Sequence, residues 1–116
     1  TWAATLATHV DGIRDQAEIV YSGSNNYSAV CTDATIVKQM QGAAGSIGIA
    51  TTSIETTLGS AGDSSHVVCH VSSGNDAYVV EAPMKTSGQY WCVDSTGISA
   101  EVTTALAGGD TACPSS

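Results

Sequence analysis

The chain has 116 residues, of which 42% are hydrophobic and 12% are charged, with eleven acidic and three basic side chains and a formal net charge of −8. A chain of this length forms one domain with a single core. Arg14, Lys38 and Lys85 are too few and too scattered to form the basic stripe that holds a phosphate backbone, which excludes nucleic-acid binding. Because the chain contains no Phe, Ala, Val, Ile and Leu must fill most of its core.

The start of the chain predicts an amphipathic helix over residues 1–22. Its larger apolar side chains recur at steps of three or four residues, which places them on one helix face: Trp2, Leu6, Val10, Ile13, Ala17 and Val20. Arg14 and Glu18 form an i,i+4 pair beside that face, and Gly23 and Asn25 are residues that end helices. Because the pattern begins at or near residue 1, we expect the helix to continue upstream in the native protein.

Residues 23–65 predict a long connection between this helix and a sheet, an αβ loop. Within it, Asp33 is a suitable N-cap for "ATIVKQM", whose apolar residues have helical spacing, so we expect a short second helix. The remainder is rich in Gly, Ser and Thr. It predicts an irregular surface loop with a short strand at residues 46–51.

Residues 66–102 have the alternating pattern of β-strands. "HVVCHVS", "DAYVVEAPM" and "QYWCVD" are separated by the turns "SGN" and "KTSG", which predicts three antiparallel strands in a meander. "DSTGISAEV" supplies a fourth short strand, and a loop then returns to Cys113. The predicted fold class is α+β: one domain over residues 1–116, with an N-terminal α-helix packed on a small antiparallel sheet of three or four strands.

Four cysteines predict two disulfide bonds. Cys31, Cys69, Cys92 and Cys113 contain no CxxC pair and no close spacing of the kind that zinc sites use, so no metal site is expected there. Small secreted domains with a thin core commonly add disulfides, so we expect an extracellular protein. The order of the cysteines leaves three connectivities open. Since no signal peptide or membrane-spanning run is visible, we expect a signal or a further segment upstream.

The stretch Asp94-Ser95-Thr96-Gly97 resembles the Asp-Thr-Gly turn of aspartic proteases only superficially. One extra residue precedes the glycine, and the sequence has no second aspartate in a matching turn, which that chemistry requires. Asp and Ser cap backbone N–H groups at the start of ordinary turns, and Gly accepts a positive φ at their end. Asp94, Ser95 and Gly97 are therefore predicted to form a structural turn.

The histidines and loop carboxylates predict neither a catalytic site nor a cofactor. On a strand, His66 and His70 point to the face opposite Cys69 and lie about 13 Å apart, too far to hold one ion, so we expect both on the solvent side. Asp94 and Asp110 belong to no EF-hand pattern and are expected to be solvated; a calcium site built from both and from loop carbonyls is the alternative left open. No serine lies in a G-x-S-x-G elbow, so no enzyme is predicted.

The stretch "YWCVDSTGISAEV", followed by "TACP", resembles the C-terminal segment of many bacterial pilin-like proteins. In these proteins an aromatic-Cys-Val-Asp-Ser-Thr-Gly strand and turn precedes a second cysteine near the end. With the helix, the αβ loop and the meander, the whole chain is similar to the globular head of a type IV pilin or a type II secretion pseudopilin. The resemblance implies a disulfide from Cys92 to Cys113 that bounds a D-region of residues 92–113. It also implies a Cys31–Cys69 bond, which many pilins lack.

The role that the resemblance implies is structural. A major pilin polymerises with copies of itself and other pilin subunits, through the pilus assembly machinery, into an extracellular cell-surface filament for adhesion, motility or DNA uptake. An apolar N-terminal half-helix holds it in the inner membrane before assembly. The helix face of Leu6, Val10, Ile13 and Ala17 is expected to be partly covered by the sheet and partly free to contact neighbouring subunits. The alternatives are a pseudopilin, which pushes secreted proteins, and a monomeric secreted binding module with two disulfides.

Overall fold

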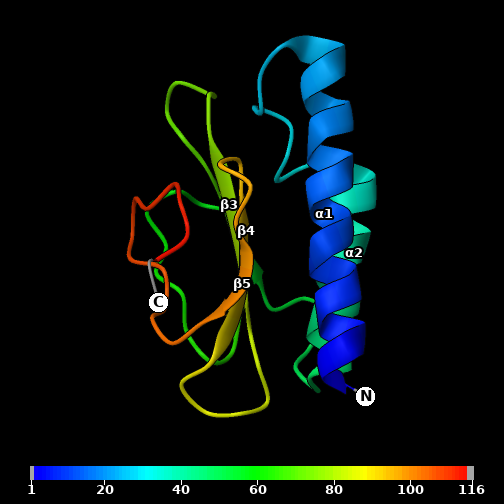
Figure 1. The fold of residues 1–116 in the computed structure, drawn as a ribbon, viewed down its shortest axis with the longest axis vertical. Coiled ribbons are helices and arrows are strands. Elements are labelled where there is room, and N and C mark those ends of the chain that lie inside the picture. The colour runs from blue at the N-terminus through cyan, green and yellow to red at the C-terminus, as the bar shows by residue number, and fades with distance from the viewer. Residues whose placement is uncertain (1, 115–116) are drawn as a thin grey trace.

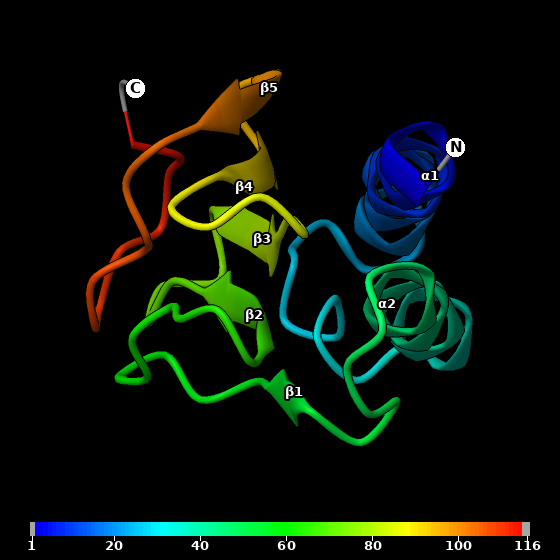
Figure 2. The ribbon, with the colours of Figure 1, turned by 90° about the horizontal axis from the view of Figure 1, so that it is seen from below.

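The computed structural model describes residues 2–114 without the side chain of Trp2, so the Trp2 position of the expected helix face lies outside the described residues. Two helices cover one face of a five-stranded sheet, and the chain after the last strand crosses the opposite face (Figure 1 and Figure 2). The helices are α1, Trp2–Ser24, and α2, Ala34–Ser46. The strands are β1, Ile54–Glu55; β2, Val67–Val71; β3, Tyr78–Pro83; β4, Tyr90–Asp94; and β5, Ser99–Val102.

Helix α1 confirms the amphipathic helix predicted for the start of the chain, and it continues to Ser24. Asn25 then has a φ of +59°, and its N–H donates to the Tyr21 carbonyl at the end of the helix. The side chains predicted as an assembly face are all buried, none more than 1% exposed: Leu6, Val10, Ile13 and Ala17. Because this face packs into the main core of the domain, no part of it is free to contact a second subunit. The prediction of a partly free face is therefore wrong.

Asp33 caps α2 as predicted. Its Oδ2 accepts hydrogen bonds from the N–H groups of Thr35 and Ile36, which satisfies two of the free donors in the first helical turn. The short strand expected at residues 46–51 is wrong. Helix α2 runs to Ser46 and ends in a turn in which Gly48 has a φ of +82°, so this segment completes a helix instead of extending.

The predicted meander is confirmed by β2, β3, β4 and β5, which pair antiparallel in sequence order. One further strand lies outside that prediction. Strand β1 pairs parallel to β2 at Ile54 and Val67, and the Val67 N–H donates to the Ser53 carbonyl. The general α+β class is therefore right, whereas the sheet is mixed and has five strands.

The strands place buried side chains on both faces of the sheet. On the helix side, the main core packs side chains of α1, α2 and the central strands around Cys31 and Cys69. On the opposite side, a smaller cluster lies beneath the end of the chain: Val68, Val79, Cys92, Val102 and Leu106. Since Leu106 comes from the loop after β5, this second cluster fixes that loop to the sheet.

Candidate functional site

Two disulfide bonds occur in the pairing that the pilin resemblance implies. Cys92 of β4 is bonded to Cys113, which closes a loop with a sequence separation of 21 residues. Cys31, which precedes α2, is bonded to Cys69 of β2 across a separation of 38 residues. Each bond joins distant parts of the chain and so restricts the unfolded state. We call residues 103–113, which follow β5 and end at Cys113, the C-terminal strap.

Asp94, the last residue of β4, joins the following turn to the end of the strap. It is 1% exposed. Its Oδ1 accepts hydrogen bonds from the Thr96 N–H at 2.9 Å, the Thr96 hydroxyl at 2.6 Å and the Ile98 N–H at 3.2 Å. Its Oδ2 accepts a hydrogen bond from the Cys113 N–H at 2.7 Å. One carboxylate therefore holds both the turn and the strap residue that closes the disulfide.

Ser95 and Gly97 complete this turn. The Ser95 N–H donates to the Tyr78 carbonyl, and Ser95 Oγ accepts a hydrogen bond from the Tyr78 N–H at 3.3 Å. These contacts continue the pairing of β3 and β4 beyond Asp94. Gly97 has a φ of +98°, which L side chains rarely adopt. Because both Asp94 oxygens accept hydrogen bonds from this turn and the strap, the residue acts as a cap and not as the proton-sharing partner of a second carboxylate.

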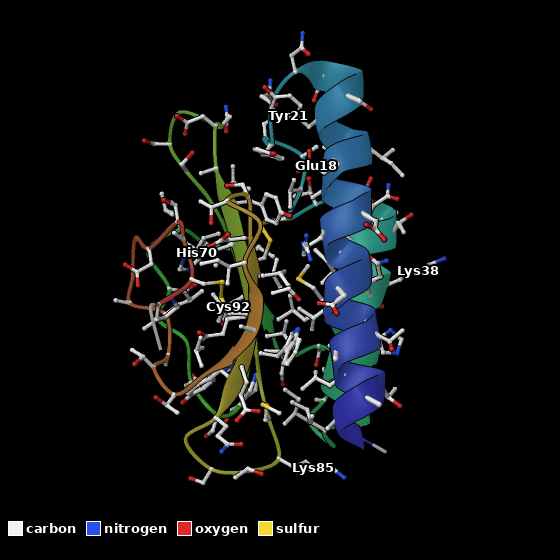
Figure 3. The ribbon with its side chains drawn as sticks, in the orientation of Figure 1. Glu18, Tyr21, Lys38, His70, Lys85 and Cys92 are labelled. Atoms are coloured by element: carbon white, nitrogen blue, oxygen red, sulfur yellow. A yellow bond between two sulfur atoms is a disulfide. The ribbon has the colours of Figure 1, made fainter. Side chains whose placement is uncertain are left out.

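Two more buried polar side chains hold the strap from neighbouring strands. On β2, His70 Nδ1 lies 2.7 Å from the Asp110 carbonyl oxygen, to which it must donate. On β3, Glu81 Oε1 accepts a hydrogen bond from the Leu106 N–H at 2.9 Å. Figure 3 shows His70 on the strap side of the sheet. Together with Asp94, three adjacent strands each contribute one polar side chain to the strap backbone.

The position of His70 corrects the expectation that it faces solvent. The predicted alternation is right, because Cys69 lies in the core on the helix side while His70 points the other way. However, His70 is 0% exposed, since the strap covers that face. Its Nε2 lies 3.3 Å from Ser60 Oγ, in the loop between β1 and β2. Two loops therefore enclose the ring.

His66 immediately precedes β2 and is partly exposed, as expected. Its Nδ1 is 3.0 Å from Asp63 Oδ1, and its Nε2 is 3.9 Å from Glu55 Oε1. Burial alone would raise the pKa of Asp63, but hydrogen bonds from His66 and the Ser65 N–H outweigh it and lower that pKa. This arrangement is a hydrogen-bonded contact between His66 and Asp63 just before β2.

Asp94 and Asp110, which the calcium alternative would combine, are both occupied by backbone donors. Asp110 Oδ2 accepts a hydrogen bond from the Ala107 N–H at 2.9 Å, while Asp94 is buried and not solvated as expected. Within residues 2–114, no three His, Cys, Asp or Glu side chains gather in a way that could hold a metal ion. The arrangement of these carboxylates is that of caps for the turn and the strap.

Glu81 is the residue of this site that the sequence pattern does not single out. It is 1% exposed, and its Oε2 is buried without a hydrogen-bond partner in the described structure. Burial raises the pKa of Glu81 to about 7, and the charge of Asp110 adds to this, although the Leu106 N–H acts in the opposite direction. The available signal in the sequence is a single acid within the apolar run "YVVEAPM".

The outer surface of α1 differs from its buried face. Ile19 is 61% exposed on that surface. Tyr21 is 40% exposed but lies on the side of α1 that faces the sheet, where its ring packs against Tyr27 with the ring centroids 4.8 Å apart. A cleft lies between α1 and the β4–β5 turn. It is lined by Arg14 and Glu18 of the helix and by Asp94 of β4. Among the described helices, neither α1 nor α2 combines the length and the apolar content of a membrane-spanning segment.

We compared the chain with protein-family models, with curated proteins and with solved structures, and none of the three comparisons found a match.

Proposed function

We propose that this chain is the globular head of a type IV pilin-like filament subunit, with the major pilin as its preferred role. The observation that carries the proposal is the loop closed by Cys92 and Cys113, held on a sheet whose other face packs a long N-terminal helix. The resemblance to pilins implies that the closed loop is the D-region and that the helix is the one that enters the filament, with the sheet between them. The two disulfides support the proposed extracellular, cell-surface location.

The role of the strap in this proposal is mechanical. The strap is held by a covalent bond at Cys113 and by backbone contacts to three adjacent strands, through His70, Glu81 and Asp94. A force on the end of the chain is therefore shared among several strands of the sheet. Such an attachment suits a subunit of a fibre under tension.

The proposed partners are copies of the chain, other pilin subunits, the pilus assembly machinery and, through an apolar segment joined to α1, the inner membrane. Because the stripe from Leu6 to Ala17 is buried, we place the contacts between heads on the outer surface of α1. Ile19, which is 61% exposed, is the large apolar side chain that the described part of α1 presents there. This changes the proposed assembly face from the inner to the outer side of the helix.

The first experiment is to determine the intact mass and the N-terminal sequence of the protein purified from its own cells. The proposal expects an additional apolar segment of about two dozen residues with a methylated first residue, long enough to cross a membrane. A native chain that starts near Thr1 and is released behind an ordinary signal peptide would instead support the secreted binding module. A short pseudopilus in place of long filaments would identify the pseudopilin alternative.

A second experiment tests the outer surface of α1. We expect Ile19→Asp to reduce filament yield about tenfold or more, because a charge would then have to be buried between subunits. Ile98→Asp is the matched control, since Ile98 is 39% exposed but lies in the β4–β5 turn. Electron microscopy counts the filaments, and thermal melting of the purified heads should shift by less than about 2 °C in either variant. Equal loss of filaments in both variants would argue against α1 as the contact.

A further inference from the structure

Glu81, Leu106 and Gly62 form a close contact beneath the strap. The Leu106 N–H donates to Glu81 Oε1, while the Leu106 carbonyl accepts a hydrogen bond from the Gly62 N–H at 2.7 Å. A Cβ atom at Gly62 would lie 2.9 Å from Glu81 Oε1 and 3.0 Å from the Leu106 nitrogen, so glycine is needed for this approach. The Glu81 carboxyl is therefore enclosed by backbone from two loops, and its Oε2 is left without a partner among the described residues.

The titratable side chains around Glu81 come from the elements packed on this face of the sheet: His70 of β2, Tyr90 and Asp94 of β4, Asp63 beside Gly62, and Asp110 of the strap. None of them forms a hydrogen bond or an ion pair with Glu81 in the described structure. Asp110 opposes negative charge on Glu81. An ionised Glu81 is thus a buried charge with one N–H donor and no cationic partner, which is unfavourable.

The strap is held by few buried side chains. Within residues 103–113, Leu106 alone is buried, and all the others are exposed or partly exposed. Segments with few apolar contacts open locally at a lower free energy than the sheet beneath them. Opening at Leu106 would admit water to the Glu81 carboxyl and expose the Cys92–Cys113 bond.

We propose that Glu81 is a protonation-controlled latch for the C-terminal strap: the strap stays closed while the Glu81 carboxyl is neutral and opens more often once that carboxyl is ionised. Opening hydrates the ionised carboxylate, whereas a neutral carboxyl gains much less from water. The raised pKa of Glu81, about 7, places this change near neutral pH. At higher pH the Cys92–Cys113 bond at the end of the strap becomes more accessible to reductants. This inference does not depend on the proposed filament function.

The test is amide hydrogen exchange of Leu106, corrected for the intrinsic effect of pH on exchange. If the Glu81 pKa is about 7 in the closed state and 4.5 in the open state, the opening equilibrium constant should rise about thirty-fold between about pH 5.5 and about pH 8.5. Leu106 should also be less protected than Val80 on the central strand β3. Equal protection at both amides would mean that the strap opens only when the whole chain unfolds, which would overturn the latch.

The E81Q variant isolates the carboxyl. Its amide oxygen can still accept the Leu106 N–H, but it cannot ionise, so the thirty-fold change should disappear. Glu101→Gln on β5 makes the same chemical change at an exposed position and should keep the parent behaviour. Only the pH dependence that E81Q removes is assigned to Glu81; an unchanged pH dependence in E81Q would overturn the proposal.

A direct measurement on the parent chain needs no variant. Carbon-13 NMR of the Glu81 carboxyl should show a titration near pH 7, accompanied by loss of protection at Leu106. A titration near the ordinary value of 4.5 would overturn the latch. This readout remains decisive if E81Q does not fold.

Discussion

At Asp94, one buried carboxylate accepts hydrogen bonds from four donors, three in the turn and one in the strap. In Asp94→Asn, an NH₂ group replaces one of the two acceptor oxygens. Whichever way the amide is oriented, an N–H then meets another donor, either at Cys113 or at Thr96 and Ile98. We expect a loss of about 1–3 kcal/mol in the free energy of unfolding, because a buried donor is left unpaired. Denaturant unfolding near pH 7 measures this loss.

Asp76→Asn is the control for that substitution. Asp76 is exposed and accepts a hydrogen bond from the Ser72 hydroxyl at the surface. Its replacement should change the free energy of unfolding by less than about 0.5 kcal/mol. If both variants lose the same free energy, the burial of the Asp94 contacts does not contribute to stability as argued.

How far the site could be predicted depends on the residue. The turn of Asp94, Ser95 and Gly97 follows from local preferences, and those same local contacts form in the structure. The burial of His70 and Glu81 could not be predicted, because it is produced by a strap more than twenty residues away in sequence. Alternation gives the face to which a strand residue points. It does not give what covers that face.

The strap as an element depends on its disulfide. In Cys92→Ser with Cys113→Ser, we expect an unchanged helical signal, because α1 and α2 pack on the other face of the sheet. By loop-closure entropy, a loop with a sequence separation of 21 residues contributes about 3 kcal/mol. For a domain of this size that corresponds to a fall of about 10 °C in Tm. Circular dichroism measures both quantities, and melting at the parent temperature would contradict the stabilising role of the bond.

Limited proteolysis separates this bond from the second disulfide. Cys31→Ser with Cys69→Ser should also lower Tm, because Cys31 and Cys69 lie in the main core. It leaves Cys113 bonded, so the strap should resist protease below the melting transition. Only the double variant that removes the Cys92–Cys113 bond should expose the strap to protease. Early cleavage of the strap in both double variants would show that the Cys92–Cys113 bond has no specific effect on it.

At the level of elements, long periodic segments were predictable and short ones were not. Helix α1 and the meander have patterns sustained over many residues, so their local signals agree with the fold. Strand β1 consists of Ile54 and Glu55 alone, and it exists because these two residues pair in parallel with Val67 and Val68 of β2. Two residues have no period to recognise. The apolar residues of 46–51 similarly follow the end of α2, where Gly48 turns the chain.

Over the whole molecule, two effects make the folded state less favourable as pH rises. The first is net charge, because the chain has eleven acidic and three basic side chains. The basic side chains are also dispersed: Figure 3 shows Lys38 on α2 far from Lys85 beyond β3. Repulsion among like charges destabilises a compact chain. The second is Glu81, whose pKa is about 7 in the fold and 4.5 ordinarily. A raised pKa means that the folded state binds the proton more tightly than the unfolded state. The contribution of Glu81 to the free energy of unfolding is therefore present in full below pH 4.5 and is lost between pH 4.5 and about pH 7.

The two effects can be separated by salt. Raising the salt concentration from about 0.05 M to about 1 M should screen the surface repulsion but not the burial of Glu81. In high salt, the parent should therefore still lose about 3 kcal/mol of unfolding free energy between about pH 4.5 and about pH 8, at 1.36 kcal/mol for each unit of pKa change. The lowered pKa of Asp63 acts in the opposite direction but belongs to an exposed group and contributes little. In high salt, E81Q should show a nearly constant free energy over the same range. A parent that is equally stable at both ends of this range in high salt would show that Glu81 is hydrated in the fold, and the enclosure beneath the strap would then be wrong.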